Sequence, residues 1–481
     1  MTHRIERNKW ILYRHTSSFD IIAAIAVNLK YFSKTSITKK DKLELLKKLR
    51  ALAYYKERNP ELPLDSINHR INTLAYFMFG YKDKIAGQDR FLFSPLGNLF
   101  LKHIENKENL SKIFFTMLWA VQFEHPHGGS DKSFNLFPFR LVFKLLSDKK
   151  LNQKLFAFEM AYLVVFTETA SEKGYENLVN KILDMRTWSD SKIEKKFLED
   201  VHPYVNATYE WDYYMSRLFK DAGIIEIEEG EVICKLPHGK STLRKLTRNS
   251  VSISPQLQDY CNLLLKKYPF DEAPLHLDDA ERMKLDVIKE IYSFYPVELL
   301  KEIGEATDDL KLELLRLPKI IEQYSNNTDG AEAYLFEDAL VDGFNMFFNV
   351  EAKKIGGAGN TDIECLYLTK KKKFAVDAKS TKNKLSGINS GRLEGHRAKI
   401  GGVYSIVVTP RYVPAVLQDI RTSPIVIIRA STFSEYLYNC IDNNVREIDY
   451  KDFDNIIIGN LGKDISKNIS DLTIGRFGTK S

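Results

Sequence analysis

Apolar residues recur at helical spacing through the first part of the chain. Residues 19–32 carry them with a period near 3.6, and residues 41–52 alternate leucine with basic residues in the same period. A third periodic run starts after Ser66, a candidate helix cap, and stops at Gly80. A basic loop over 81–84, a short strand at 91–93 and a Pro-x-Gly exit follow. Helix, turn and strand pair predict a winged helix-turn-helix outline.

The same order returns later in the chain. Residues 210–222 form an amphipathic, aromatic-rich segment that stops at Gly223. Residues 224–227 and 232–236 then alternate apolar and polar around an acidic turn at 228–231, which predicts a hairpin. Paired small helix-wing units are a DNA-binding arrangement, so we expect two of them here. Two ordinary α+β modules are the alternative.

Residues 325–330 interrupt the pattern with the Ser/Asn/Gly-rich segment SNNTDG, the clearest domain boundary in the chain. The predicted division has four parts. These are a first winged-helix-like subdomain (1–105), a helical region with a second such subdomain (106–250), a charged helical connector (251–329) and a C-terminal α/β domain (330–481).

Strand-like patterns dominate after this break. A helix over 331–348 carries Glu337, and a glycine-rich loop leads to strands at 363–368 and 374–379. Because side chains alternate along a strand, Asp377 and Lys379 point to the face opposite the apolar residues of the second strand. Asp362 lies at the start of the neighbouring strand, beside this pair.

Two neighbouring carboxylates bind a hard divalent cation such as Mg²⁺ through oxygen. A lysine two residues on polarises a water or stabilises a pentacovalent phosphate. Asp362, Asp377 and Lys379 therefore form a set suited to phosphodiester hydrolysis. An exposed ion pair between Asp377 and Lys379 is the alternative interpretation.

The spacing Thr361-Asp362, fourteen residues, Asp377-Ala378-Lys379 is a form of the PD-(D/E)xK nuclease motif, with threonine in place of the usual proline. The elements expected afterwards are a helix (385–400), a strand (403–409), a helix (413–421) and a strand (425–428). The predicted fold class is therefore a mainly helical, winged-helix-like N-terminal region for DNA recognition, joined to a mixed-sheet α/β nuclease core.

Composition adds limits rather than a function. The 481 residues are 44% hydrophobic and 28% charged with a net charge of +6, which permits a polyanionic partner without requiring one. The four cysteines lie far apart, so zinc ribbons and disulfide frameworks are not expected. No apolar run has the length of a bilayer span, and no signal peptide opens the chain. We expect a cytoplasmic protein without membrane contact.

Several polar residues on predicted helices are candidates for contacts with DNA. They are Arg70 and Asn72 on the first helix-wing unit, Arg217 and Lys220 on the second, and Lys384 and Arg392 after the motif. A solvated surface is the alternative for each of them.

Taken in order, these segments resemble the AlwI-like family of type IIS restriction endonucleases. The resemblance covers the first wing near 93–97, the segment 119–123, the unit over 217–236 and the stretch from Phe336 to Lys379. It implies Mg²⁺-dependent cleavage of double-stranded DNA at a fixed offset from a short asymmetric site. It also implies that Asp362, Asp377 and Lys379 are the metal-binding and catalytic set, with Glu337 as a helix carboxylate that helps to hold the metal.

One catalytic centre per chain means that cutting both strands requires a transient homodimer or a partner subunit. A cognate DNA methyltransferase is the expected genetic partner. Two alternatives remain from the sequence. One is a strand-nicking or structure-specific repair nuclease, and the other is a winged-helix DNA-binding regulator with an inactive nuclease domain.

Overall fold

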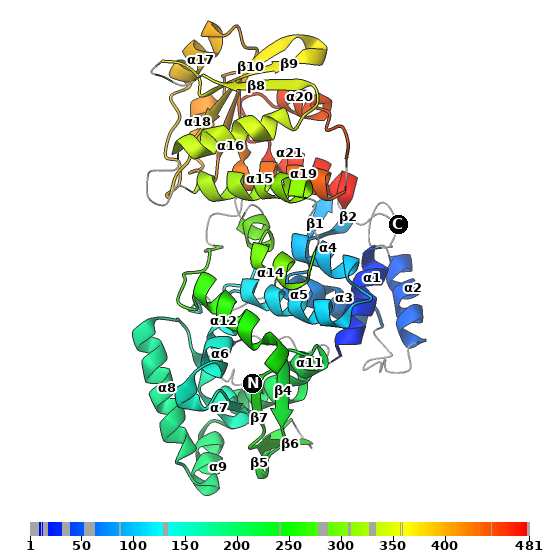
Figure 1. Ribbon diagram of the computed structural model, residues 1–481, viewed down its shortest axis with the longest axis vertical. Coiled ribbons are helices and arrows are strands. Elements are labelled where there is room, and N and C mark those ends of the chain that lie inside the picture. The colour runs from blue at the N-terminus through cyan, green and yellow to red at the C-terminus, as the bar shows by residue number, and fades with distance from the viewer. Residues whose placement is uncertain are drawn as a thin grey trace, which may run out of the picture.

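The computed structural model has a mainly helical N-terminal part and a C-terminal part built on a five-stranded sheet (Figure 1). It describes residues 9–10, 12, 18–30, 39–51, 63–85, 88–127, 133–239, 242–277, 287–305, 309–326, 333–355, 357, 359–443 and 445–478. In this described part, no helix is long and apolar enough to cross a membrane.

The first helices and strands pack into one apolar core that runs from Trp10 to Ile303 and also includes Ile474 near the C-terminus. The helices are α1 (Phe19–Lys30), α2 (Lys39–Arg50), α3 (Pro63–Tyr76), α4 (Pro95–Lys102), α5 (Lys107–Ala120), α6 (Pro138–Leu146), α7 (Ala157–Tyr162), α8 (Glu172–Arg186), α9 (Asp190–Glu199), α10 (Val201–Glu210), α11 (Ser216–Asp221), α12 (Gln258–Lys267) and α14 (Val297–Glu302). The strands are β1 (Gly80–Ile85), β2 (Gln88–Phe93), β3 (Leu155–Phe156), β4 (Ile225–Glu228), β5 (Val232–His238), β6 (Thr242–Thr247) and β7 (Ser250–Ile253).

The first helix-hairpin unit is present, with two local differences from the expectation. Residues 81–84 belong to strand β1, which pairs antiparallel with β2, and are not a loop. The Pro-x-Gly segment starts helix α4 and is not an exit from the unit. Ser94 caps this helix by accepting a hydrogen bond from the Gly97 amide at 3.0 Å, and Pro95 occupies the first turn, where no amide donor is needed.

The second predicted hairpin is wrong in its pairing. Strands β4 and β5 do not pair with each other; β4 pairs with β7, and β5 pairs with β6. The two pairs are nested, so the reversal lies next to Gly239 rather than at the acidic segment 228–231. Gly239 has a φ of +70°, which suits the chain reversal, whereas the acidic segment only links β4 to β5.

The C-terminal part supplies the five-stranded sheet and the helices on its two faces. The strands are β8 (Val350–Lys354), β9 (Ile363–Tyr367), β10 (Lys372–Ala378), β11 (Ser405–Thr409) and β12 (Ile425–Arg429). The helices are α15 (Asp309–Ser325), α16 (Ala333–Asn345), α17 (Ser390–Lys399), α18 (Val416–Ile420), α19 (Ala430–Asp442), α20 (Lys451–Ile458) and α21 (Ser466–Phe477).

The sheet is mixed, in the order β12-β11-β10-β9-β8. Strands β8, β9 and β10 are antiparallel neighbours, and β10, β11 and β12 run parallel. One face of the sheet packs on α15, α16, α19, α20 and α21 through a large apolar cluster. A smaller cluster with α17 and α18 covers the other face at β11 and β12. Helix α17 also contacts β10 on this second face.

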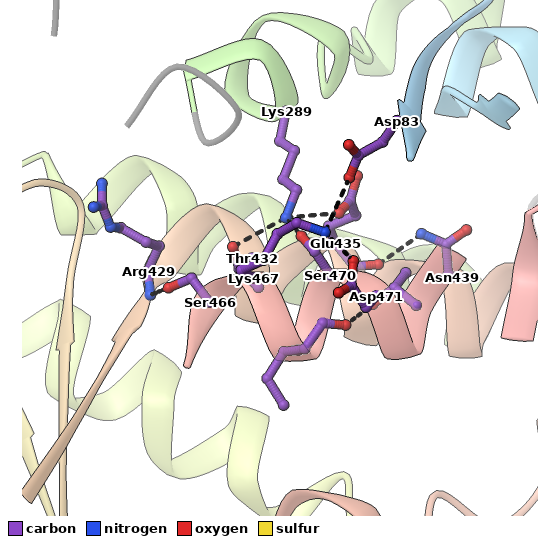
Figure 2. Close-up of polar contacts among 12 residues, drawn as sticks. Asp83, Lys289, Arg429, Thr432, Glu435, Asn439, Ser466, Lys467, Ser470 and Asp471 are labelled. Atoms are coloured by element: carbon purple, nitrogen blue, oxygen red, sulfur yellow. Dashed lines mark hydrogen bonds and ion pairs between the residues drawn. The ribbon is translucent and has the colours of Figure 1, made fainter. Parts of the chain in front are cut away.

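The two parts meet at a polar junction (Figure 2). The buried Lys289 ammonium group donates to Thr432 at 3.2 Å and lies 3.3 Å from the Glu435 carboxylate on α19. Tyr81 on β1 donates to the same carboxylate at 2.6 Å, and Lys467 on α21 lies 3.8 Å from Asp83. The hairpin β1–β2 is therefore attached to the back of the sheet domain.

The predicted boundary at 329/330 falls in 327–332, outside the described residues. Helix α15, which we expected in the connector, packs against α16 and α19 and contributes Ile321 to the core of the sheet domain. The four-part division itself stays a prediction.

Candidate active site

Asp362 and Asp377 lie side by side on the face of the sheet that α17 contacts. Strands β9 and β10 pair Ile363 with Val376, so the next position along each strand brings the two aspartates opposite one another. Directly opposed residues in an antiparallel pair share a face. The Asp362 carboxylate also accepts a hydrogen bond from the Ala378 amide at 2.8 Å. The structure thus brings together the two carboxylates that the sequence placed on neighbouring strands.

Lys379 completes this group from the end of β10. Its ammonium group forms an ion pair with the buried Asp377 carboxylate, and its amide donates to Val408 of β11 at 2.8 Å. Burial lowers the pKa of Lys379 from its ordinary value; the negative charge of Asp362 opposes this shift, and the positive charge of Arg392 adds to it. The lysine is therefore held by both its backbone and its charge next to the aspartates.

Thr361 fixes the start of β9 against β10. Its side chain is buried, and its hydroxyl donates to the Val376 carbonyl at 3.0 Å. The hydroxyl thus ties together the residues that immediately precede Asp362 and Asp377. A proline at this position could not make this bond.

Glu337 faces the same region from helix α16, but its carboxylate is already paired. It lies 3.1 Å from the ammonium group of Lys354, which also lies 2.9 Å from Asp338. The charge of Glu337 raises the pKa of Lys379, so the two groups interact electrostatically. Lys354 was not among the expected site residues. The structure buries Val350 and Ala352 of β8 and exposes the residues between and after them. The alternation of apolar and polar residues at these positions is the sequence signal that predicts this edge strand.

Helix α17 adds two residues to the margin of the site. Arg392 is exposed and acts on the pKa of Lys379. His396 is buried, and its Nδ1 atom has no hydrogen-bond partner in the part of the chain that the structure describes. Burial, followed by the charges of Arg392 and Lys399, lowers the pKa of this imidazole from its ordinary value. His396 was not among the candidate residues named from the sequence.

The other candidates for DNA contacts are dispersed. Arg217 and Lys220 are exposed on α11, and Lys384 is exposed after β10. Arg70 is buried within α3, and Asn72 accepts a hydrogen bond from the Lys82 ammonium group.

The aspartate pair suits a divalent cation in its chemistry, since Asp362 and Asp377 present carboxylate oxygens on one face beside a buried charge. Over the described ranges, however, no three His, Cys, Asp or Glu side chains are gathered closely enough to hold a metal ion. The Glu337 carboxylate is paired with Lys354 in this structure.

Comparisons with known proteins identify relatives of this chain among type II restriction endonucleases. The family model for the N-terminal domain of the type II restriction endonuclease HgaI matches residues 5–268. The type II restriction enzyme HgaI of Avibacterium volantium is 45% identical over 478 residues, which cover 98% of this chain and 98% of that protein.

Structures of the restriction endonuclease FokI, alone and bound to DNA, align over 95% of this chain and 98% and 100% of theirs. Their identity is 8% and the TM-scores are 0.25 and 0.26, values that do not establish a shared fold.

The resemblance seen in the sequence is therefore confirmed at the level of type II restriction endonucleases, while the comparisons do not single out the AlwI-like family. The protein belongs to the family of the type II restriction endonuclease HgaI.

Proposed function

We propose that this family member is a type IIS enzyme, which hydrolyses double-stranded DNA at a fixed offset from a short asymmetric site and requires Mg²⁺. The observation that carries the proposal is the meeting of Asp362, Asp377 and Lys379 on one face of the sheet. The distance between this face and the exposed helix α11 also supports it. The two lie toward opposite ends of the molecule, an arrangement that favours cutting away from the recognised bases (Figure 1).

The sheet domain is, in this proposal, a PD-(D/E)xK nuclease core. Its antiparallel β8-β9-β10 meander, followed by the parallel strands β11 and β12 with α17 between β10 and β11, supports the assignment. The motif residues lie at the end of β10 and just before β9, on the sheet face that α17 contacts.

In the proposed mechanism the chain supplies both the ligands and the charge for in-line attack of water on phosphorus. Asp362 and Asp377 would hold Mg²⁺, and Glu337 would join them on release from Lys354. The bound ion would polarise the phosphate and lower the pKa of a coordinated water. Lys379 orients the attacking water and balances the negative charge that develops on the phosphate oxygens.

Glu337 and its neighbour Asp338 provide a matched test of the third ligand. Both carboxylates contact Lys354, but Asp338 is exposed. We expect Glu337→Gln to raise the Mg²⁺ concentration for half-maximal cleavage by about tenfold, the usual lower range for loss of a supporting ligand. Asp338→Asn should leave it unchanged. Equal Mg²⁺ titrations for the two variants would remove Glu337 from the site.

The experiment that tests the proposed function is a plasmid digest with Mg²⁺ and sequencing of both strands at the fragment ends. Type IIS cutting gives ends at a constant distance from one shared asymmetric sequence. Breaks in one strand only would support the nicking alternative. A cleavage rate that rises more than linearly with enzyme concentration would support a transient homodimer for the second strand.

Restriction of this kind also requires a cognate DNA methyltransferase that protects the host sites. We place both proteins in the cytoplasm, where the DNA is.

A further inference from the structure

The hairpin β5–β6 projects from the end of the molecule opposite the sheet domain (Figure 1). Its inner face carries Leu236 and Leu246, both fully buried. Its outer face is exposed and contains the four residues Lys235, Pro237, Leu243 and Lys245. We call these four residues the outer face of the hairpin.

Two lysines oppose each other on this outer face. Lys235 and Lys245 are direct cross-strand partners. Like charges in that position destabilise an antiparallel pair. Neither ammonium group has an ion-pair partner among the residues that the structure describes. The repulsion is therefore unrelieved within the described chain, and a regularly spaced polyanion would relieve it.

An apolar pair lies next to the lysines, toward the reversal of the chain. Pro237 is the cross-strand partner of Leu243, and the Leu243 side chain is 58% exposed. An exposed leucine beside two lysines suits a partner with charges at its rim and apolar surface between them. A groove of duplex DNA has this character, with phosphates at its edges and base edges at its floor.

Stacked arginines border the hairpin on its other side. The Arg244 guanidinium lies over the rings of Tyr209 and Tyr213, at 4.2 Å and 5.2 Å from the centroids, and Arg217 lies 5.3 Å from that of Tyr213. Stacking on tyrosine fixes the guanidinium plane without using its charge on a carboxylate. Arg244 is the cross-strand partner of the buried Leu236, so it lies on the side of the hairpin opposite Lys235 and Lys245. Arg244 was not among the sequence candidates.

We propose that the outer face of hairpin β5–β6 is a DNA-reading surface. Lys235 and Lys245 contact phosphates on the two sides of a groove, and Leu243 contacts base edges at its floor. This inference rests on the proposed function in one respect: it takes double-stranded DNA as the substrate and states where the enzyme binds it.

The test is duplex binding by the full-length protein in EDTA, where no cleavage occurs, over a range of salt concentrations. We expect Lys235→Ala with Lys245→Ala to weaken binding by about tenfold and to reduce the slope of log affinity against log salt by about 2, because each lost phosphate contact removes about one counterion. The control is Lys173→Ala with Lys181→Ala on α8, which removes the same charge from another exposed surface.

A second variant separates loss of binding from loss of folding. Lys245→Glu creates an opposite-charge pair with Lys235, so it should raise the thermal stability while weakening DNA binding further. Leu243→Ala should keep the salt slope and reduce the preference for a fragment with the mapped site over one without it. An unchanged slope in the double-alanine variant, or wild-type binding by Lys245→Glu, would overturn the proposal.

These results are independent of the nuclease assignment. A normal cleavage rate in variants of Asp377 would remove the catalytic site and leave the hairpin result standing. If the hairpin variants bound DNA like the wild type, the assignment of the catalytic site would be unaffected.

Discussion

At the scale of single residues, the site depends on short polar contacts that orient two carboxylates. Thr361 and Asp362 each bond across to β10, one to the Val376 carbonyl and one to the Ala378 amide. These bonds fix the end of β10 against the start of β9. The orientation of Asp377 therefore depends on Thr361, a residue to which we assign no contact with the substrate.

Thr361 offers a direct test of this dependence. Thr361→Val keeps the shape but leaves the buried Val376 carbonyl without its hydroxyl donor, so we expect a loss of about 1–2 kcal/mol in the free energy of unfolding and slower cleavage. Thr361→Ser retains the hydroxyl and should behave like the wild type in both respects. Urea unfolding and plasmid cleavage measure the two effects. A valine variant as stable and active as the serine variant would contradict this role.

Most of the candidate site was predictable because strand alternation fixes which side chains share a face. Asp362, Asp377 and Lys379 follow from that rule and from one tight turn. The pairing of Glu337 with Lys354 did not follow, since it joins a helix to an edge strand that was not among the expected elements. The burial of Arg70 could have been predicted from the sequence. This residue lies three positions after Ile67 and four before Leu74, on the buried stripe of α3.

At the scale of elements, two helical glycines serve opposite purposes. A Cβ atom on Gly97 in α4 would lie 2.0 Å from the Phe79 carbonyl oxygen, so this helix needs glycine to approach the start of the hairpin. A Cβ atom on Gly395 in α17 would meet nothing within 4 Å, so glycine there only weakens the helix.

We therefore expect opposite outcomes from the same substitution. Gly97→Ala should lower the free energy of unfolding by roughly 2 kcal/mol or more, because backbone must move. Gly395→Ala should raise it by about 0.5–1 kcal/mol, the usual gain in an exposed helix interior. Urea unfolding of the two variants gives the comparison. A loss of stability in both variants would show that the open surroundings of Gly395 do not determine how its substitution changes the free energy of unfolding.

Element types were easier to predict from the sequence than strand partners. In the first unit a strand pair was expected after the helix and the strand at 91–93 was placed, but residues 81–84 of β1 were taken for a loop. In the second unit β4 pairs with β7 across the whole β5–β6 hairpin, and local alternation carries no information about such nested pairing. The acidic segment 228–231 has the composition of a turn, yet the reversal uses Gly239.

At the scale of the whole molecule, the junction between the two parts contains a buried acid. Glu322 on α15 borders a cavity of about 320 Å³ that is also lined by Tyr81 of the hairpin and Glu435 of α19. Burial raises the pKa of Glu322 to about 7; Lys319 opposes the shift, and Glu290 and Glu435 add to it. The cavity lies at the junction between the two parts and is separate from the candidate active site at Asp362 and Asp377.

A raised pKa in the folded state gives a stability that is present at low pH. It is complete below the ordinary pKa of a glutamate, near 4.5, and is lost as the pH rises through about 7. We expect the melting temperature of the wild type to fall between pH 6 and pH 8 by about 1–2 °C more than that of Glu322→Gln. Scanning calorimetry at the two pH values measures this difference. Parallel curves for the two proteins would contradict the assignment.

The proposed active site is probed at its centre by Asp377→Asn, assayed for plasmid cleavage with Mg²⁺ and for duplex binding in EDTA. This substitution keeps the size of the side chain and removes the negative charge between Asp362 and Lys379. We predict that cleavage falls by at least about a thousandfold, as on loss of an essential metal-binding or catalytic group, while duplex affinity stays within about twofold of the wild type. Cleavage at a rate close to that of the wild type would show that these carboxylates are not the catalytic centre.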